Sequence, residues 1–178
     1  MEIEVKGIDS LREKLKKLPQ ILNQATNQAM FEVTETIRST AEDNAPVGIY
    51  TGGGELKGSI HAIVDNEDGK IVGRVWSDKK QAIFTEFGTG PRGQASPKDL
   101  PEGIEPVYTQ ERWFIPADLL APGVAEAYHF RQIKIDGQVF YLCYGQPAQP
   151  WLYPAIKENK DKIPEIMSKY IEQGLGGV

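Results

Sequence analysis

The fold is decided by the stretch QILNQATNQAMFEVTETIRSTAEDN, residues 20–44, and by the change of pattern that follows it. Apolar positions recur every three to four residues, at Leu22, Ala25, Ala29, Val33, Ile37 and Ala41. This spacing predicts one long amphipathic helix, about 37 Å in length. Several of the positions are alanine, so we expect the segment that packs there to come close. Pro46 is expected to stop the helix.

A shorter helical segment precedes this helix. Asp9 or Ser10 can cap its N-terminus, and one of its faces is apolar through Leu11, Leu15 and Leu18. Pro19 either ends this segment or lies in the first turn of the long helix, where its missing N–H group costs nothing.

Beyond the glycine-rich loop of residues 47–57, the apolar period changes from 3.6 to 2. Residues 60–64 and 71–77 alternate on either side of the turn Asn66-Glu67-Asp68-Gly69, which predicts a β-hairpin with one buried face. Residues 81–87 fit a third strand or a short helical turn equally well. Residues 88–103 have turn-forming residues and almost no large apolar side chain, so we expect an exposed, mobile loop.

The second half of the chain predicts more strands and then a helix. A short strand is expected at residues 112–116, and residues 128–135 and 138–144 flank Asp136-Gly137, a strong hairpin signal. A helix begins near Pro154, and Pro164 should kink or split it. The pattern predicts an α+β fold. Its parts are a long N-terminal helix packed on an antiparallel sheet, an inserted β-hairpin region and a C-terminal helix.

The composition is that of an ordinary globular protein and argues against several other classes. The 178 residues are 40% hydrophobic and 25% charged, and the net charge of −5 with scattered basic residues argues against sequence-specific binding to nucleic acid. The single cysteine, Cys143, excludes an intrachain disulfide. No stretch approaches the ~20 apolar residues of a transmembrane helix, and the N-terminus lacks the apolar region of a signal peptide. We therefore expect a soluble protein made and used in a cytoplasm, with no membrane partner.

One glycine motif resembles a phosphate-binding loop. Gly88-Thr89-Gly90-Pro91-Arg92-Gly93 matches G-x-G-x-x-G, which in dinucleotide-binding proteins follows a strand and opens a helix. Gln94-Ala95-Ser96-Pro97 is not expected to supply that helix, and no Lys-Ser/Thr pair follows for a P-loop. We predict a flexible exposed loop and no nucleotide cofactor.

His61, His129 and Cys143 are the other candidates for chemistry. Zinc needs three or four ligands, usually two of them closely spaced, and the two histidines lie in different predicted strands. Cys143 follows Leu142 in a predicted strand, where a thiol usually packs as a small hydrophobic group. A hydrolase that uses Cys143 with a histidine is an alternative, but we predict no metal, no cofactor and no enzyme activity.

Two segments are not explained by the fold alone. Residues 85–90, TEFGTG, place an acid and an aromatic directly before the glycine loop. Residues 146–155, QPAQPWLYPA, form a stiff, proline-rich entry to the last helix. Trp151 in this segment is either a staple that packs the helix start on the core or an anchor for another subunit.

In this order, the two segments resemble the head–tail joining or tail-completion (neck) proteins of tailed bacteriophages, a family typified by the tenth gene product of a lambda-like siphophage. Its motif Y-A-x-x-x-E-F-G-T-G corresponds to Gln81–Gly90, and Q-P-x-P-F-L-x-P-A-L corresponds to Gln146–Ile156, with Trp151 in the aromatic slot. The earlier family motifs match Gly7-Ile8-Asp9-Ser10-Leu11, Ala45-Pro46-Val47, Thr51-Gly52 and Leu56-Lys57-Gly58-Ser59-Ile60. The chain departs from the pattern at Gln81, where the family has tyrosine, in extra glycines after Thr51, and in a long insertion. We therefore expect a single tail-completion-like domain, residues 1–178, with a β-rich insertion at about 91–145.

The resemblance implies a non-enzymatic structural protein of the virion, in the tail or neck of a long-tailed phage or prophage and assembled in the bacterial host cytoplasm. It implies that the protein completes the tail or joins head and tail. The implied partners are copies of itself, in a ring on assembly and a monomer in isolation, together with tail-tube and head-connector proteins. We expect these contacts at Glu86, Phe87, Gly88, Thr89, Gly90, Gln149, Pro150, Trp151, Tyr153 and Pro154. The alternatives are a head-closure or minor capsid component, or a peptide-binding module that uses Trp151.

Overall fold

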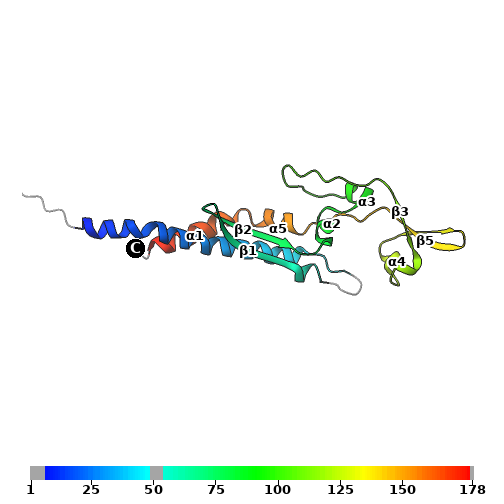
Figure 1. The fold of residues 1–178 in the computed structure, drawn as a ribbon, viewed down its shortest axis with the longest axis horizontal. Helices are drawn as coiled ribbons and strands as arrows, with labels where there is room; N and C mark the ends of the chain where they lie inside the picture. Colours follow the sequence, from blue (N-terminus) through cyan, green and yellow to red (C-terminus); the bar gives the residue numbers. More distant parts are fainter. Residues whose placement is uncertain (1–6, 49–53, 177–178) are drawn as a thin grey trace, which may run out of the picture. The chain divides into compact units, whose positions relative to one another are not determined.

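The computed structural model describes residues 7–48 and 54–176 and confirms the α+β class (Figure 1). The chain divides into two compact units. We call Met1–Thr40, His61–Trp76 and Ile156–Val178 the helical unit, and Ala41–Ile60 with Ser77–Ala155 the motif unit. That the chain folds as one domain with an insertion at about 91–145 stays a prediction. Thr51 and Gly52 of the sequence motifs lie outside the described residues.

The first helix, α1, is continuous from Ile8 to Asn44, so Pro19 neither ends one helix nor starts another. Pro19 removes the N–H group that would bind the carbonyl of Leu15, and Leu15 is exposed, so water can satisfy this carbonyl. Good helix formers on both sides continue the helix through the proline. The predicted end is confirmed, because α1 stops two residues before Pro46.

In the helical unit, the predicted hairpin is confirmed and lies along α1 (Figure 1). Strand β1 (Ile60–Glu67) pairs with β2 (Lys70–Ser77). Asp68 and Gly69 both have positive φ, of 50° and 77°, as a type I′ turn requires. Gly73 of β2 faces α1 so closely that an added methyl group would lie 2.1 Å from Thr34 Oγ1.

The C-terminal helices complete the helical unit. The predicted split is confirmed, because α5 (Leu152–Asn159) ends before α6 (Lys162–Gly176), which has Pro164 in its first turn. Asn159 is buried at this break; its Nδ2 donates to Thr40 Oγ1 of α1 at 2.9 Å, and Lys162 Nζ donates to its Oδ1 at 2.9 Å. The expected close packing at the alanines is also confirmed, since a methyl group on Gly174 would lie 3.2 Å from Ala25 Cβ.

The motif unit contains short elements and a sheet of its own. Its helical turns are η1 (Lys57–Ser59), α2 (Gln81–Phe87), α3 (Gly90–Ala95), η2 (Ala117–Leu119) and α4 (Val124–Ala127). Its strands are β3 (Trp113–Pro116), β4 (Arg131–Ile135) and β5 (Gln138–Cys143), in the antiparallel order β3-β5-β4. Residues 81–87, which fit a strand or a short helical turn by sequence, thus form helix α2.

One detail of the predicted β-rich region is wrong. The strand expected from residue 128 begins at Arg131, because α4 and the positive φ of His129 (53°) precede it. The inserted strands form a sheet separate from the β1–β2 hairpin. The Asp136-Gly137 turn is confirmed, with positive φ at both residues and Ile133 opposite Phe140. No helix among the described residues is long and apolar enough to cross a membrane.

Candidate functional site

The two motifs meet in the motif unit, where Glu86 caps the start of α5. Its Oε2 accepts hydrogen bonds from the backbone N–H groups of Trp151 (2.7 Å) and Leu152 (2.9 Å). Its Oε1 accepts one from the N–H group of Tyr153 at 2.9 Å. These donors have no partner inside the helix, and a carboxylate also interacts favourably with the positive end of the helix dipole. Glu86 is only 7% exposed, so this carboxylate is committed to its own chain.

Trp151 is packed inside the chain. It is 3% exposed, and its indole Nε1 donates to the carbonyl of Ala82 in α2 at 3.2 Å. This geometry favours the first of the two interpretations, in which Trp151 packs the start of the last helix on the core. A role for Trp151 in a subunit contact stays a prediction.

Further hydrogen bonds, made by residues before and after Glu86, join the first motif to the second. The N–H group of Gln149 donates to Thr85 O at 2.8 Å, and that of Thr89 donates to Gln146 O at 2.9 Å. The amide Nε2 of Gln146 also donates to Phe84 O at 2.9 Å. We call residues 82–96 with residues 144–153 the clasp. It closes a loop of about sixty residues with main-chain contacts.

The glycines of the G-x-G-x-x-G motif permit this close approach. A methyl group on Gly88 would lie 2.7 Å from Ala148 N, and one on Gly90 would lie 2.6 Å from Tyr144 O. On Gly93 it would lie 2.5 Å from Gly88 C. All three glycines are buried. The expected exposed loop is therefore wrong for residues 88–93, because these residues pack against the second motif.

A helix also begins inside the glycine motif, contrary to expectation. Helix α3 starts at Gly90 with Pro91 in its first turn, where proline is well tolerated. The surface of the glycines that could approach a phosphate is covered by residues 144–148 of the same chain. The motif thus has a packing role here.

The ten predicted contact residues fall into two groups by exposure. Those that are buried in the clasp are Glu86, Gly88, Gly90 and Trp151. Those that keep some exposure are Phe87, Thr89, Gln149, Pro150, Tyr153 and Pro154. The structure brings all ten into one region, but only the second group has surface to offer a partner. Their contact with a partner stays a prediction.

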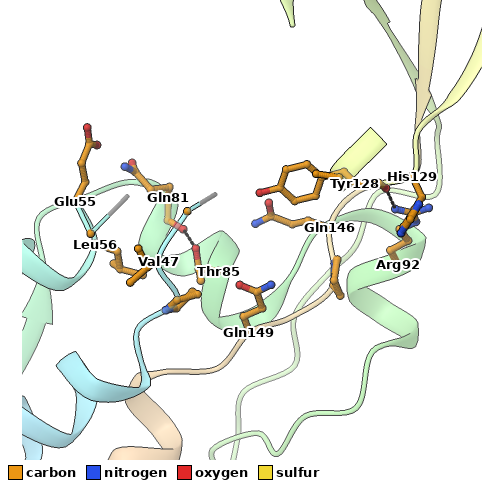
Figure 2. A pocket seen from close by; sticks show the side chains of 15 residues that line it. Val47, Glu55, Leu56, Gln81, Thr85, Arg92, Tyr128, His129, Gln146 and Gln149 are labelled. Atoms are coloured by element: carbon orange, nitrogen blue, oxygen red, sulfur yellow. Dashed lines mark hydrogen bonds between the residues drawn. The ribbon is translucent and has the colours of Figure 1, made fainter. Parts of the chain in front are cut away.

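A hollow of about 740 Å³ with polar and apolar lining lies beside the clasp (Figure 2). Gln81, Gln146 and Gln149 contribute amide groups to its wall, and Thr85 donates to Gln81 O at 2.9 Å. Arg92 lies at the far end, where its Nη1 donates to the carbonyl of Tyr128 at 3.1 Å. The lining thus offers three amide groups together with the charged side chains of Glu55 and Arg92.

The candidates for chemistry are dispersed. His61 lies in β1 of the helical unit with its ring 5.6 Å from that of Trp76, whereas His129 precedes β4 of the motif unit. Cys143 is buried at the end of β5, opposite Trp113. Among residues 7–48 and 54–176, no group of three His, Cys, Asp or Glu side chains could hold a metal ion.

Sequence reasoning missed the roles of two buried polar residues, Glu86 and Asn159. Glu86 was recognised in its motif, but its role as a helix cap was not, because its partners lie 65 to 67 positions further along the chain. Two sequence features could have indicated this cap: an acid in the first motif and a helix start bordered by prolines in the second. Asn159 gave no signal, since it ends an ordinary amphipathic stretch.

Comparison with protein-family models gives a match. Residues 9–88, a little under half of the chain, match the family model HK97-gp10_like, described as "Bacteriophage HK97-gp10, putative tail-component". The match covers α1, the β1–β2 hairpin and α2, and ends inside the first motif. Curated proteins and solved structures give no match. The predicted resemblance is confirmed over this range: residues 9–88 are similar to a family described as putative bacteriophage tail components.

Proposed function

We propose that this protein is a non-enzymatic structural component of a long-tailed phage or prophage virion, which completes the tail or joins head and tail at the neck. It acts by self-association and by docking to tail-tube or head-connector proteins. The observation that carries this proposal is the clasp. The family-matching range ends at Gly88, and the clasp fastens that end to the second motif of the predicted neck family.

The surface around the clasp supports a docking role. Ile83 and Phe84 of α2 are more than half exposed, although they belong to the first motif. Val107, which is 98% exposed, lies near them on the wall of the same groove. Clustered apolar side chains on a protein surface usually mark a site of protein contact.

Electron microscopy with purified virion parts tests the proposal. Tail tubes that lack this protein and DNA-filled heads that lack tails are each incubated with the protein. We expect density at one end of the tubes, and tubes so completed should join the heads. Binding to the heads alone would instead support head closure, and indifference to both would refute a neck role.

A matched variant makes this test specific. Phe84→Asp places a charge on the exposed apolar surface and should abolish tube binding, with an unchanged circular dichroism spectrum. Lys70→Glu, at the exposed start of β2 in the helical unit, should bind normally. Equal binding by both variants would show that tube binding does not depend on the surface around α2.

A further inference from the structure

The first turns of α1 present an apolar seam that nothing in the described chain covers. The seam follows alternating steps of three and four residues, through Ile8, Leu11, Leu15, Leu18, Leu22, Ala25 and Ala29. Helix α6 covers its later part, where Gly174 approaches Ala25 and Ile21, and α6 ends at Gly176 (Figure 1). Leu11 and Leu15 are each 56% exposed. Since a strict three–four repeat is the pattern of helix-to-helix seams, the uncovered part is suited to a partner with a matching apolar surface.

This segment of α1 is basic. Within residues 8–20, two acids each lie three positions before a basic residue: Asp9 is 3.8 Å from Arg12, and Glu13 is 2.8 Å from Lys16. Lys14 and Lys17 add positive charge that these pairs do not balance. The seam of about three turns thus has a net positive border in a chain whose net charge is −5.

The motif unit carries an apolar groove of about 570 Å³ with an acidic border. Ile83, Phe84, Ile104 and Val107 supply its exposed apolar side chains, and Glu105 lies on its wall. Residues 99–111 contain four acidic residues and no lysine or arginine.

Two basic residues, Lys98 and Arg112, adjoin this segment. Lys98 Nζ donates to the carbonyls of Gly93 and Ser96 and lies 5.2 Å from the centre of the Tyr108 ring. These uncharged partners hold the ammonium group in place without neutralising it. Four acids and two bases leave residues 98–112 with a net charge of −2.

We propose that the first turns of α1 of one copy dock in the groove of a second copy, with Leu11 and Leu15 entering the groove and Lys14 and Lys17 facing its acidic border. This inference rests on the proposed self-association and names its two surfaces. Such a contact joins two different surfaces of identical chains, which is the arrangement a ring formed by rotation requires. An apolar helix face in an apolar groove is a common mode of protein recognition.

Charge selects this pairing over the two self-pairings. Two copies of the α1 segment side by side would bring surplus lysines together, and two grooves face to face would bring glutamates together. Like charges across an interface are unfavourable, whereas opposite charges favour encounter and fix register.

Disulfide trapping between chains that each carry one cysteine in addition to the buried Cys143 tests the proposal. Leu15→Cys and Val107→Cys chains carry tags of different size and are mixed under mild oxidation. We expect the mixed Leu15→Cys/Val107→Cys product to form at least roughly tenfold faster than either self-product, because docking raises the effective concentration of the two thiols. The wild-type chain, whose only thiol is buried, measures the background. Lys70→Cys mixed with Val107→Cys measures random collision. A mixed product no faster than this control, or a dominant Leu15→Cys self-product, overturns the proposal.

A charge exchange provides the second readout. Lys14→Glu with Lys17→Glu in the Leu15→Cys chain should reduce the mixed product to the collision rate. Glu102→Lys with Glu105→Lys in the Val107→Cys chain should then restore it. Failure of restoration contradicts the assigned charge pairing.

The docking inference and the neck role can fail separately. If no mixed product forms but the protein still binds tail tubes, only the docking inference is lost. If the mixed product forms and neither tubes nor heads are bound, the neck role is lost.

Discussion

In the helical unit side chains pack against side chains, whereas in the clasp of the motif unit backbone packs against backbone. Gly73 lets β2 approach the Thr34 side chain of α1, and Gly174 lets α6 approach Ala25. At the clasp, Gly145 instead faces the carbonyl oxygen of Thr89, a main-chain atom. A side chain can rotate or be shortened, but a backbone carbonyl cannot move without moving its segment. Glycine at the clasp should therefore be far less replaceable than glycine in the helical unit.

The largest effect is expected for Gly145→Ala. Its methyl group would lie 1.8 Å from Thr89 O, and the residue has φ of +90°, which disfavours any side chain. We expect a loss of about 4 kcal/mol in the free energy of unfolding, measured by urea denaturation. Gly137→Ala is the matched control, because Gly137 has φ of +85° and nothing within 4 Å of an added methyl group. It should lose only about 1 kcal/mol. Equal losses would mean that the close approach at Gly145 contributes nothing.

Removal of the Glu86 carboxylate should have the next largest effect. Glu86→Ala leaves three N–H groups at the start of α5 without their acceptor, at an expected loss of about 3 kcal/mol. Glu86→Gln should lose less, because its amide oxygen still accepts. Amide hydrogen exchange at residues 151–153 should accelerate in both variants. Glu111→Gln, at an exposed acid of the same unit, should change neither measurement. Unchanged exchange in Glu86→Ala would show that Glu86 does not hold the helix start.

The same contrast explains what the sequence could predict. Periodicity reports which side of a helix or strand is buried, so the long part of α1 and both hairpins could be derived from residue spacing. The break between α5 and α6, just before Pro164, could be expected from the proline. The hairpin turns also have local chemistry, since Asp-Gly favours positive φ in both. These elements depend on residues close together in the sequence.

The clasp could not be derived in this way. Its contacts join residues 52 to 69 positions apart, and its glycines are buried by a segment that local rules cannot pair with them. Composition alone made residues 88–103 resemble a loop, because glycine has the same signature in a mobile turn and in a tight backbone contact. Only the resemblance to a known family linked the two motifs before the structure showed their contact.

A smaller loss is expected for Gly73→Ala in the helical unit. The added methyl group overlaps Thr34 Oγ1, a side-chain atom, and we expect a loss of about 2 kcal/mol from overpacking. Thr34→Ala removes that oxygen. The double variant should therefore be more stable than expected from the sum of the two single losses, as measured by a double-mutant cycle in urea. Strictly additive losses would show that Thr34 is not the reason why position 73 needs glycine. The contrast between side-chain packing in the helical unit and backbone packing in the clasp would then weaken.

The smallest effect should come from Glu32, which links α1 to α6 at the surface of the helical unit. The Tyr170 hydroxyl donates to Glu32 Oε2 at 2.6 Å, and Lys169 Nζ lies 3.3 Å from the same oxygen. The hydrogen bond from Tyr170, supported by Lys169 and opposed by desolvation, lowers the pKa of Glu32. A carboxyl whose pKa is depressed on folding stabilises the protein above its unfolded pKa, and this contribution is lost as the pH falls through its folded pKa.

Glu32→Gln should therefore lower Tm slightly at neutral pH, and the difference from the wild type should vanish in acid. The same hydrogen bond raises the pKa of Tyr170, so the wild type should lose this contribution again as alkaline pH ionises the phenol. The same Glu32→Gln change in a Tyr170→Phe chain is the control, because phenylalanine has no hydroxyl that ionises. The alkaline loss should be smaller there than in the chain that has Tyr170. A Glu32→Gln difference that persists unchanged in acid would assign the effect to packing instead. Side-chain contacts in the helical unit would then adjust to a lost charge as well as to a change of size. The backbone contacts of the clasp cannot adjust in this way.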